Sequence, residues 1–246
     1  MAYFAERERI SRRADLPALK SRPVSDDRLT VVLIGGGAIA ESHLKFLDDM
    51  ENARVVAVCD QNIQAARALC DRYRIFYAYD DPKEMLKKER PDVVHILTPP
   101  QSHAELAELA ISHGCHVLVE KPMAMNAEEA RRMVTLARER GVRLCVDHNH
   151  LYDPLMVRAR RIVESGRLGE ILWVESYYGF DLGNNPRSRY MLPGGQDHWT
   201  FHIPGGLYQN LAPHPLSLAL EIIGKPTSLR ATARYGRVLP HQNTDE

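Results

Sequence analysis

The chain has 246 residues, a formal net charge of zero and 44% hydrophobic residues, an ordinary composition for a globular protein. The balanced charge gives no reason to expect nucleic acid or an anionic membrane surface as a partner. No apolar run is long enough for a membrane span or a signal-peptide core, and the four cysteines form no CxxC pair. We therefore expect a cytoplasmic protein with buried, reduced thiols.

Strands and helices are predicted to alternate through the first part of the chain. Residues 1–28 carry mixed charge and few apolar side chains, so we interpret them as an arm. The predicted strands that follow are 31–34, 53–59, 76–79, 93–97, 117–119 and 142–146. The predicted helices begin near Ala38, Ile63, Pro82, Ser102 and Asn126. This alternation predicts a Rossmann-type, doubly wound parallel sheet over residues 29–152.

A run of three glycines separates the first predicted strand from the first helix. Together with Ala40 it has the spacing G-x-G-x-x-A. Gly35 permits a tight turn, Gly37 lets backbone approach a phosphate, and the small Ala40 lets the helix pack on the strand. The amides at the helix start would then face a dinucleotide pyrophosphate. The predicted cofactor-binding loop is Gly35, Gly36, Gly37, Ala38 and Ile39.

The same glycines would also fit a simple strand-to-helix turn, so the residue that ends the next strand is decisive. That residue is Asp60, 25 positions after Gly35. Its carboxylate can accept hydrogen bonds from the adenosine ribose hydroxyls and would repel a 2′-phosphate, which favours NAD over NADP. Asp60 is also placed to cap the following helix.

The pattern changes after Pro154. A helix over 155–165 leads to an alternating strand over 171–180, and a polar loop covers 181–205. A helix over 207–223 precedes another alternating strand over 228–238. Two such strands and two helices make a poor domain alone, so we interpret residues 153–246 as an incomplete α+β domain.

Two further strand ends carry chemical groups. The strand over 93–97 ends in Thr98-Pro99-Pro100, with His103 following, and the strand over 117–119 ends in Glu120-Lys121-Pro122. Ligands of such sheets bind beyond the carboxyl ends of the strands. An ammonium group there can hydrogen-bond a substrate oxygen and help a proton leave, although a surface lysine in a turn is the plainer interpretation. The peptide bond before Pro122 is open to the cis form.

These motifs together resemble the Gfo/Idh/MocA oxidoreductase family, the group of glucose–fructose oxidoreductase and inositol dehydrogenase. The matching segments are Gly35 to Ala40, Thr98 to Pro100 with His103, Glu120 to Pro122, Val146 to Pro154, and Gly205 to His214. The resemblance implies a Rossmann domain and a second domain with an open, mostly antiparallel sheet. It also implies NAD or NADP, hydride transfer at a sugar or cyclitol carbon, and a homo-oligomer. Thr98, Pro99, Pro100, His103, Glu120 and Lys121 then join the predicted cofactor-binding set.

The resemblance also implies catalytic residues. Lys121 matches the family lysine at the reacting oxygen, and His214 matches the acid/base histidine. Asn210 stands where many relatives have aspartate, four residues before His214, and on one helix the two would share a face. Ser217 and Leu151 replace an aspartate and an arginine that are frequent in the family, so the substrate stays open.

Other interpretations remain at this point. A glycosidase-like enzyme with retained NAD, a non-catalytic cofactor-binding regulator and an incomplete chain are the alternatives, because relatives usually continue through the rest of the second sheet. The loop residues Arg187, Arg189, Tyr190, His198 and Trp199 fit either substrate recognition or a solvated loop. We expect no metal site, since His148, His150, His198 and His202 are irregularly spaced.

Overall fold

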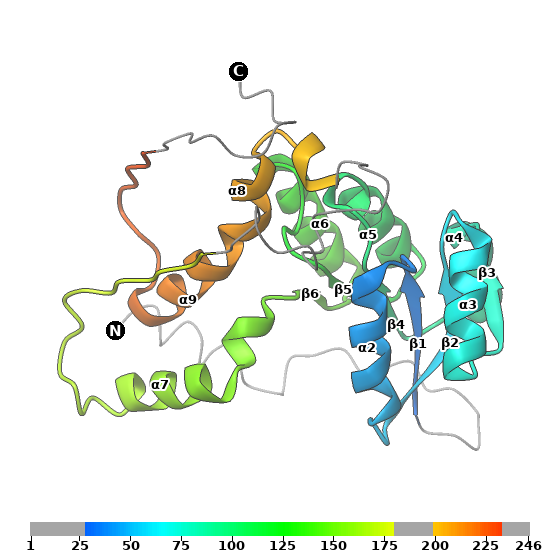
Figure 1. Cartoon of the computed structure of the whole chain (residues 1–246), viewed down its shortest axis with the longest axis horizontal. Helices are drawn as coiled ribbons and strands as arrows, with labels where there is room; N and C mark the ends of the chain where they lie inside the picture. Colours follow the sequence, from blue (N-terminus) through cyan, green and yellow to red (C-terminus); the bar gives the residue numbers. More distant parts are fainter. Residues whose placement is uncertain (1–27, 180–198, 233–246) are drawn as a thin grey trace. The chain divides into compact units, whose positions relative to one another are not determined.

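The computed structural model describes residues 28–179 and 199–232 of the chain (Figure 1). The chain divides into two compact units, Met1–Asp147 and His148–Glu246. Most of the predicted arm lies outside the described residues, as do the loop residues Arg187, Arg189, Tyr190 and His198.

The first unit is built on a six-stranded sheet with the order β3-β2-β1-β4-β5-β6. All neighbouring strands run parallel. The strands are β1 (Leu29–Ile34), β2 (Ala53–Cys59), β3 (Tyr77–Tyr79), β4 (Val93–Ile96), β5 (His116–Val119) and β6 (Leu144–Val146). This is the Rossmann strand order. Successive strands are added in one direction from β1 to β3 and in the opposite direction from β4 to β6, and such sheets bind their ligands at this switch point between β1 and β4. The predicted doubly wound sheet is confirmed.

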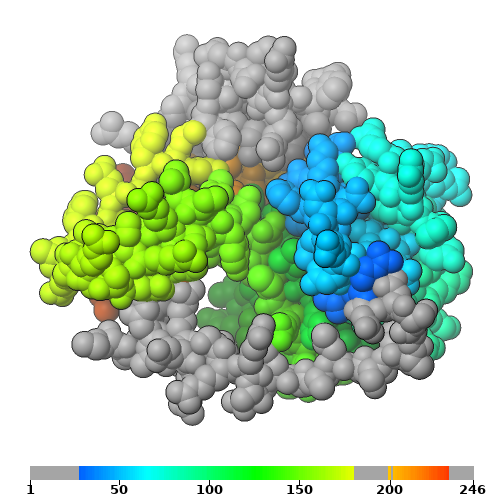
Figure 2. Space-filling view, turned by 90° about the horizontal axis from the view of Figure 1, so that it is seen from below, coloured from blue at the N-terminus to red at the C-terminus, as the bar shows by residue number. Residues whose placement is uncertain are grey.

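Helices cover the two faces of this sheet. They are α2 (Ala38–Asp48), α3 (Ile63–Tyr73), α4 (Pro82–Glu89), α5 (His103–Ser112) and α6 (Ala127–Arg140). Alternation along β1 separates two cores: Val31 and Leu33 pack with α2 and α3, whereas Val32 and Ile34 pack with α4, α5 and α6. Figure 2 shows the blue surface of α2 beside the cyan surface of α3, and an Arg72–Glu41 ion pair of 2.6 Å joins the two helices.

Local sequence signals explain several helix ends and correct others. Asn126 caps α6 by accepting from the amide of Glu129 at 2.9 Å, as its sequence pattern predicts. The prediction that Asp60 caps α3 is wrong, because the N-cap is Asn62, which accepts from the amide of Gln64. Ser102 precedes α5 without capping it, since its hydroxyl donates back to Thr98 at 2.7 Å.

Helix α2 buries a narrower stripe than the sequence pattern indicates. Its buried residues are Ala40, Leu44 and Leu47, and the small Ala40 is fully covered. Helical spacing in the sequence predicts that Phe46 lies on the apolar stripe of this helix, but its side chain is 75% exposed. Packing in the core shared with β1, β2 and α3 therefore decides which apolar residues of α2 stabilise the fold.

We predict that Leu44→Ala lowers the free energy of unfolding by about 3 kcal/mol, because a large buried side chain leaves a cavity. Phe46→Ala on the same helix is the matched control and should change it by less than about 0.5 kcal/mol, since its ring already lies in water. Urea unfolding of both variants measures the difference. Equal losses from the two substitutions would contradict this account of α2 packing.

The second unit contains three α-helices among its described residues: α7 (Pro154–Glu164), α8 (Gly206–Leu211) and α9 (Pro213–Ile223). Arg160 on α7 donates to Glu221 on α9 at 3.0 Å, which ties these helices together. The single helix predicted over 207–223 is divided at Ala212, whose own backbone is helical. The division reflects Pro213, which has no N–H to donate.

The strand predicted over 171–180 is not formed in its described part, residues 171–179. Residues 228–232 likewise carry no strand, and the rest of that predicted strand lies outside the described residues. A strand requires a hydrogen-bonded partner, and alternating side chains alone do not supply one. Trp173 and Tyr177, which the alternating pattern places on one side of the predicted strand, are 81% and 92% exposed.

All four cysteines are free. Cys59, Cys70 and Cys115 are buried, as expected, whereas Cys145 is exposed, contrary to expectation. In the described ranges, no helix has both the length and the apolar character required to cross a bilayer.

Candidate active site

The glycine loop lies between β1 and α2, as predicted. Gly35 has a φ of 107°, and a Cβ there would meet the carbonyl carbon and oxygen of Leu97 at 2.8 Å. Gly37 is exposed and precedes α2 as its N-cap. Among residues 28–179 and 199–232, no atom lies within 4 Å of a Cβ added at Gly37, and no side chain caps α2. Gly35 thus allows the backbone at the end of β1 to lie close to that of Leu97. Gly37 leaves the start of α2 open to an anion.

Asp60 faces this loop from the end of β2. Its Oδ2 accepts a hydrogen bond from the amide of Gly36 at 2.6 Å, and its Oδ1 accepts one from the amide of Asn62 at 2.8 Å. These two bonds fix the plane of the carboxylate, while each oxygen retains a lone pair. The exposed Gly37, the uncapped helix and Asp60 together fit the phosphate and ribose of a dinucleotide.

The loops that follow β4 and β5 are joined by His103. Its Nε2 lies 2.7 Å from the carbonyl oxygen of Thr98, and its Nδ1 lies 2.9 Å from that of Pro122. The Lys121–Pro122 peptide bond is cis. Burial lowers the pKa of His103, although both carbonyl contacts oppose the shift. The side chain is fully buried. His103 therefore links the two loops, and its contact with the cofactor stays a prediction.

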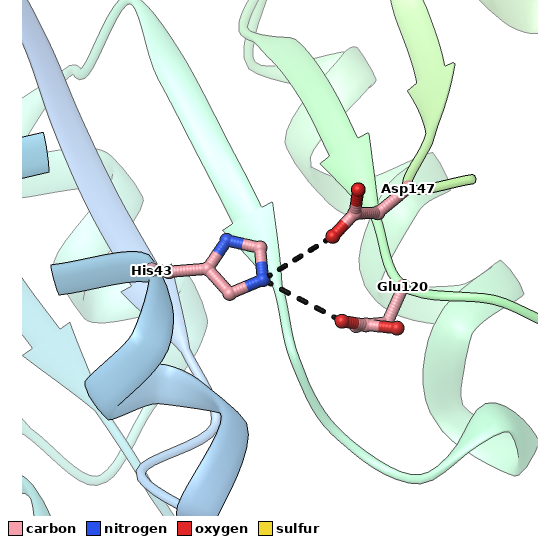
Figure 3. Close-up of side chains that lie close together, drawn as sticks. All are labelled: His43, Glu120 and Asp147. Atoms are coloured by element: carbon pink, nitrogen blue, oxygen red, sulfur yellow. Dashed lines mark hydrogen bonds and ion pairs between the residues drawn. The ribbon is translucent and has the colours of Figure 1, made fainter. Parts of the chain in front are cut away.

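Glu120 belongs to a cluster of polar side chains that the sequence motifs did not reveal. His43 on α2 points at the ends of β5 and β6 (Figure 3), with its Nε2 3.5 Å from Glu120 Oε1 and 3.5 Å from Asp147 Oδ2. Its Nδ1 lies 3.2 Å from Nδ1 of His95. Burial raises the pKa of Glu120, but the hydrogen bond from His43 and the charge of Lys121 outweigh it and lower that pKa overall.

The sequence signal for this cluster is the position of polar residues within or directly after apolar strands. Glu120 and Asp147 each follow the last residue of a strand, and His95 interrupts an otherwise apolar strand. Within the described part of the chain, His43, Glu120 and Asp147 are also the one group whose ligand atoms lie close enough together for a metal ion, all within 4.8 Å of one another.

The second unit holds the other two predicted catalytic residues. Asn210 on α8 and His214 on α9 are both buried. The ring of His214 lies 4.7 Å from that of His150 and 5.3 Å from that of Tyr178, between centroids. His150 contacts Asp153, with Nδ1 and Oδ2 2.9 Å apart. The sequence motifs did not mark His150 and Tyr178 as neighbours of His214.

Family models match nearly all of the chain. Residues 29–148 match the model described as "Oxidoreductase family, NAD-binding Rossmann fold". Residues 156–246 match the Gfo/Idh/MocA C-terminal domain.

Curated relatives are similar in sequence to this chain over part of their length. D-glucoside 3-dehydrogenase of Escherichia coli is 38% identical over 144 residues, which are 58% of this chain and 41% of that protein. D-apiose dehydrogenase of Paraburkholderia graminis is 30% identical over 204 residues, 83% of this chain and 52% of that protein. The chain therefore spans about half the length of the curated relatives it matches.

Solved structures of oxidoreductases are also similar to this chain over part of their length. An oxidoreductase from Agrobacterium radiobacter in complex with NAD⁺, L-tartaric acid and magnesium has a TM-score of 0.67 and 26% identity, covering 80% of this chain and 55% of that one. The WlbA dehydrogenase of Bordetella pertussis, in complex with NADH and UDP-GlcNAcA, has a TM-score of 0.56 and 29% identity, covering 58% of this chain and 44% of that one. With its Rossmann unit and both family models matched, the chain belongs to the Gfo/Idh/MocA family of oxidoreductases.

Proposed function

We propose that the chain is part of an NAD-dependent dehydrogenase that moves a hydride between nicotinamide and a hydroxyl-bearing carbon of a sugar, sugar derivative or cyclitol. One observation carries this proposal: the glycine loop, Asp60 and the Glu120–Lys121 pair all follow strands of one parallel sheet. The carboxyl ends of parallel strands share one edge. The relatives named for D-glucoside and D-apiose support the substrate class.

In this proposal the bound cofactor supplies a nicotinamide C4 that accepts or gives the hydride. The ammonium of Lys121 hydrogen-bonds the reacting oxygen and stabilises negative charge as it develops there. His214 takes the hydroxyl proton when the alcohol is oxidised and returns it in the reverse direction. Asn210 cannot take a proton, so its part is to hold a substrate hydroxyl or to orient His214 by hydrogen bonding.

Binding measurements test the proposal first. We expect NADH to bind the purified chain and raise its melting temperature, with weaker binding of NADPH. A panel of sugars and cyclitols then identifies a substrate that gives net NADH. A folded chain that binds neither nucleotide would contradict the proposal. Cleavage of glycosides without net NADH would instead support the glycosidase-like alternative.

We predict that Asp60→Asn moves the ratio of the NADH and NADPH dissociation constants at least tenfold toward NADPH. The amide keeps an oxygen acceptor for Gly36 but loses the charge that binds ribose hydroxyls strongly and repels a 2′-phosphate. Fluorescence titrations with both nucleotides measure the ratio. Asp71→Asn, on the exposed side of α3, is the charge-matched control and should leave the ratio unchanged. The same ratio in both variants would show that Asp60 does not select the cofactor.

A further inference from the structure

The polar cluster around His43 lies on a face of the sheet that is otherwise apolar. Leu33 and Leu97 on this face belong to the core beneath α2 and α3. His95 lies beside Leu33 in register and is 8% exposed. Buried polar groups cost stability unless they are hydrogen-bonded, so their arrangement here needs a reason.

Backbone hydrogen bonds place the two carboxylates on this same face. The amide of Glu120 donates to Ile96 at 2.9 Å, and the amide of Asp147 donates to Val119 at 2.8 Å. These bonds continue the parallel ladder one residue beyond β5 and β6. Side chains alternate along a strand, so Glu120 and Asp147 emerge on the side of α2, toward His43, as Figure 3 shows.

The proton positions on His43 follow from its partners. Ionised carboxylates only accept hydrogen bonds, so Nε2, which faces both Glu120 and Asp147, carries a hydrogen. Burial and the neighbouring His43 lower the pKa of His95 to about 3, so that ring is neutral. One hydrogen then lies between the two Nδ1 atoms, 3.2 Å apart. Both nitrogens of His43 are therefore engaged, and the ring is held from two sides.

Glu120 transmits this arrangement to Lys121. Its Oε1 faces His43, and its Oε2 accepts a hydrogen bond from the backbone amide of Lys121 at 3.1 Å. The carboxylate thus joins the ring of His43 to the turn that carries Lys121. With Pro122 held next to His103, the turn is supported on both sides of the lysine.

From these contacts we infer that His43 is a positioning residue, which holds the Glu120 carboxylate and thereby sets the position and charge environment of the Lys121 ammonium. His95 fixes the ring of His43, and Oδ2 of Asp147 lies 3.5 Å from the same nitrogen, Nε2. The consequence for catalysis rests on the proposed dehydrogenase function. The effect on Lys121 itself does not.

The reactivity of Lys121 tests this without requiring turnover. Trace acetic anhydride acylates unprotonated amines, and mass spectrometry of the whole chain gives the rate at each lysine. We expect His43→Leu to raise the rate at Lys121 at least threefold, because the carboxylate that favours the ammonium is no longer held. Lys45, on the same helix, should react as before; if it speeds up equally, the effect is general loosening of α2 and the inference fails.

Conservative and distant variants complete the test. His43→Gln keeps an N–H donor near the position of Nε2 and should restore the rate at Lys121 to within twofold of the native chain. His113→Leu, beyond the last residue of α5, is the histidine control and should change nothing. If His43→Leu does not fold, His43→Gln and His43→Ala are compared instead, with the same expected order.

Kinetics and metal binding give the remaining outcomes. With a substrate in hand, His43→Leu should lower kcat at least thirtyfold while the dissociation constant of NADH stays within threefold. Unchanged lysine reactivity and unchanged kcat would overturn the inference. If the native chain shows no turnover, the proposed function fails, and the reactivity of Lys121 alone then tests the inference about His43. Calorimetric Zn²⁺ binding that is lost in His43→Leu would also overturn it, because a metal-bound Nε2 cannot donate a hydrogen bond.

Discussion

Replacing Lys121 by alanine is expected to lower kcat for NAD-dependent turnover of the substrate by about 100-fold to 10,000-fold, the range for loss of a positioned catalytic group. The substitution removes the ammonium group that the proposal places at the reacting oxygen. The backbone amide of Lys121 remains, so Glu120 keeps its hydrogen-bond donor at 3.1 Å. The dissociation constant of NADH should change less than threefold, because the glycine loop and Asp60 are untouched.

Steady-state kinetics and NADH fluorescence separate these two expectations. Lys88→Ala is the control for removal of a lysine, since Lys88 is exposed and pairs on the surface of α4 with Glu84, 2.5 Å away. Its turnover should equal that of the native chain. Turnover retained in Lys121→Ala would exclude the proposed role of the lysine, and loss of NADH binding in the same variant would show that its role lies in the cofactor site.

Gly35→Ala is expected to lower the free energy of unfolding by about 4 kcal/mol. The residue has a φ of 107°, a conformation that costs a side-chain-bearing residue about 1–3 kcal/mol. The added Cβ would also lie 2.8 Å from backbone atoms of Leu97, and overpacking adds about 1–3 kcal/mol. Backbone atoms cannot move away from the added Cβ as the end of a flexible side chain can. We therefore expect the cost of the positive φ and the cost of overpacking to add.

Gly37→Ala is the matched substitution two residues later. Gly37 has a φ of −73° and open space around its Cβ position, so the stability of the chain should change by less than about 1 kcal/mol. NADH binding should weaken at least tenfold, because a methyl group would occupy the space through which backbone approaches a phosphate. Urea unfolding and NADH titration of both variants give the comparison. Equal stability of Gly35→Ala and Gly37→Ala would contradict the packing argument.

The first unit could be predicted almost completely because its signals are local. Buried strands read as apolar runs, Asn126 and Gly141 mark the two ends of α6, and three glycines mark the loop after β1. The second unit could not, since an alternating segment such as 171–179 becomes a strand only when another segment pairs with it. The division of the helix at Ala212 was also missed, although Pro213 gave a local reason for it.

For the candidate site, the residues at the strand ends could be predicted from the amino-acid sequence, because each follows an apolar run directly: the glycines, Asp60 and Glu120-Lys121. The contacts that hold these residues in place could not be predicted, because they join distant parts of the chain. His103 is buried between two loops, and His43 meets Glu120 and Asp147 across 77 and 104 positions of the chain. Such contacts depend on the register of β4, β5 and β6 and on the packing of α2 over them, which periodicity does not encode.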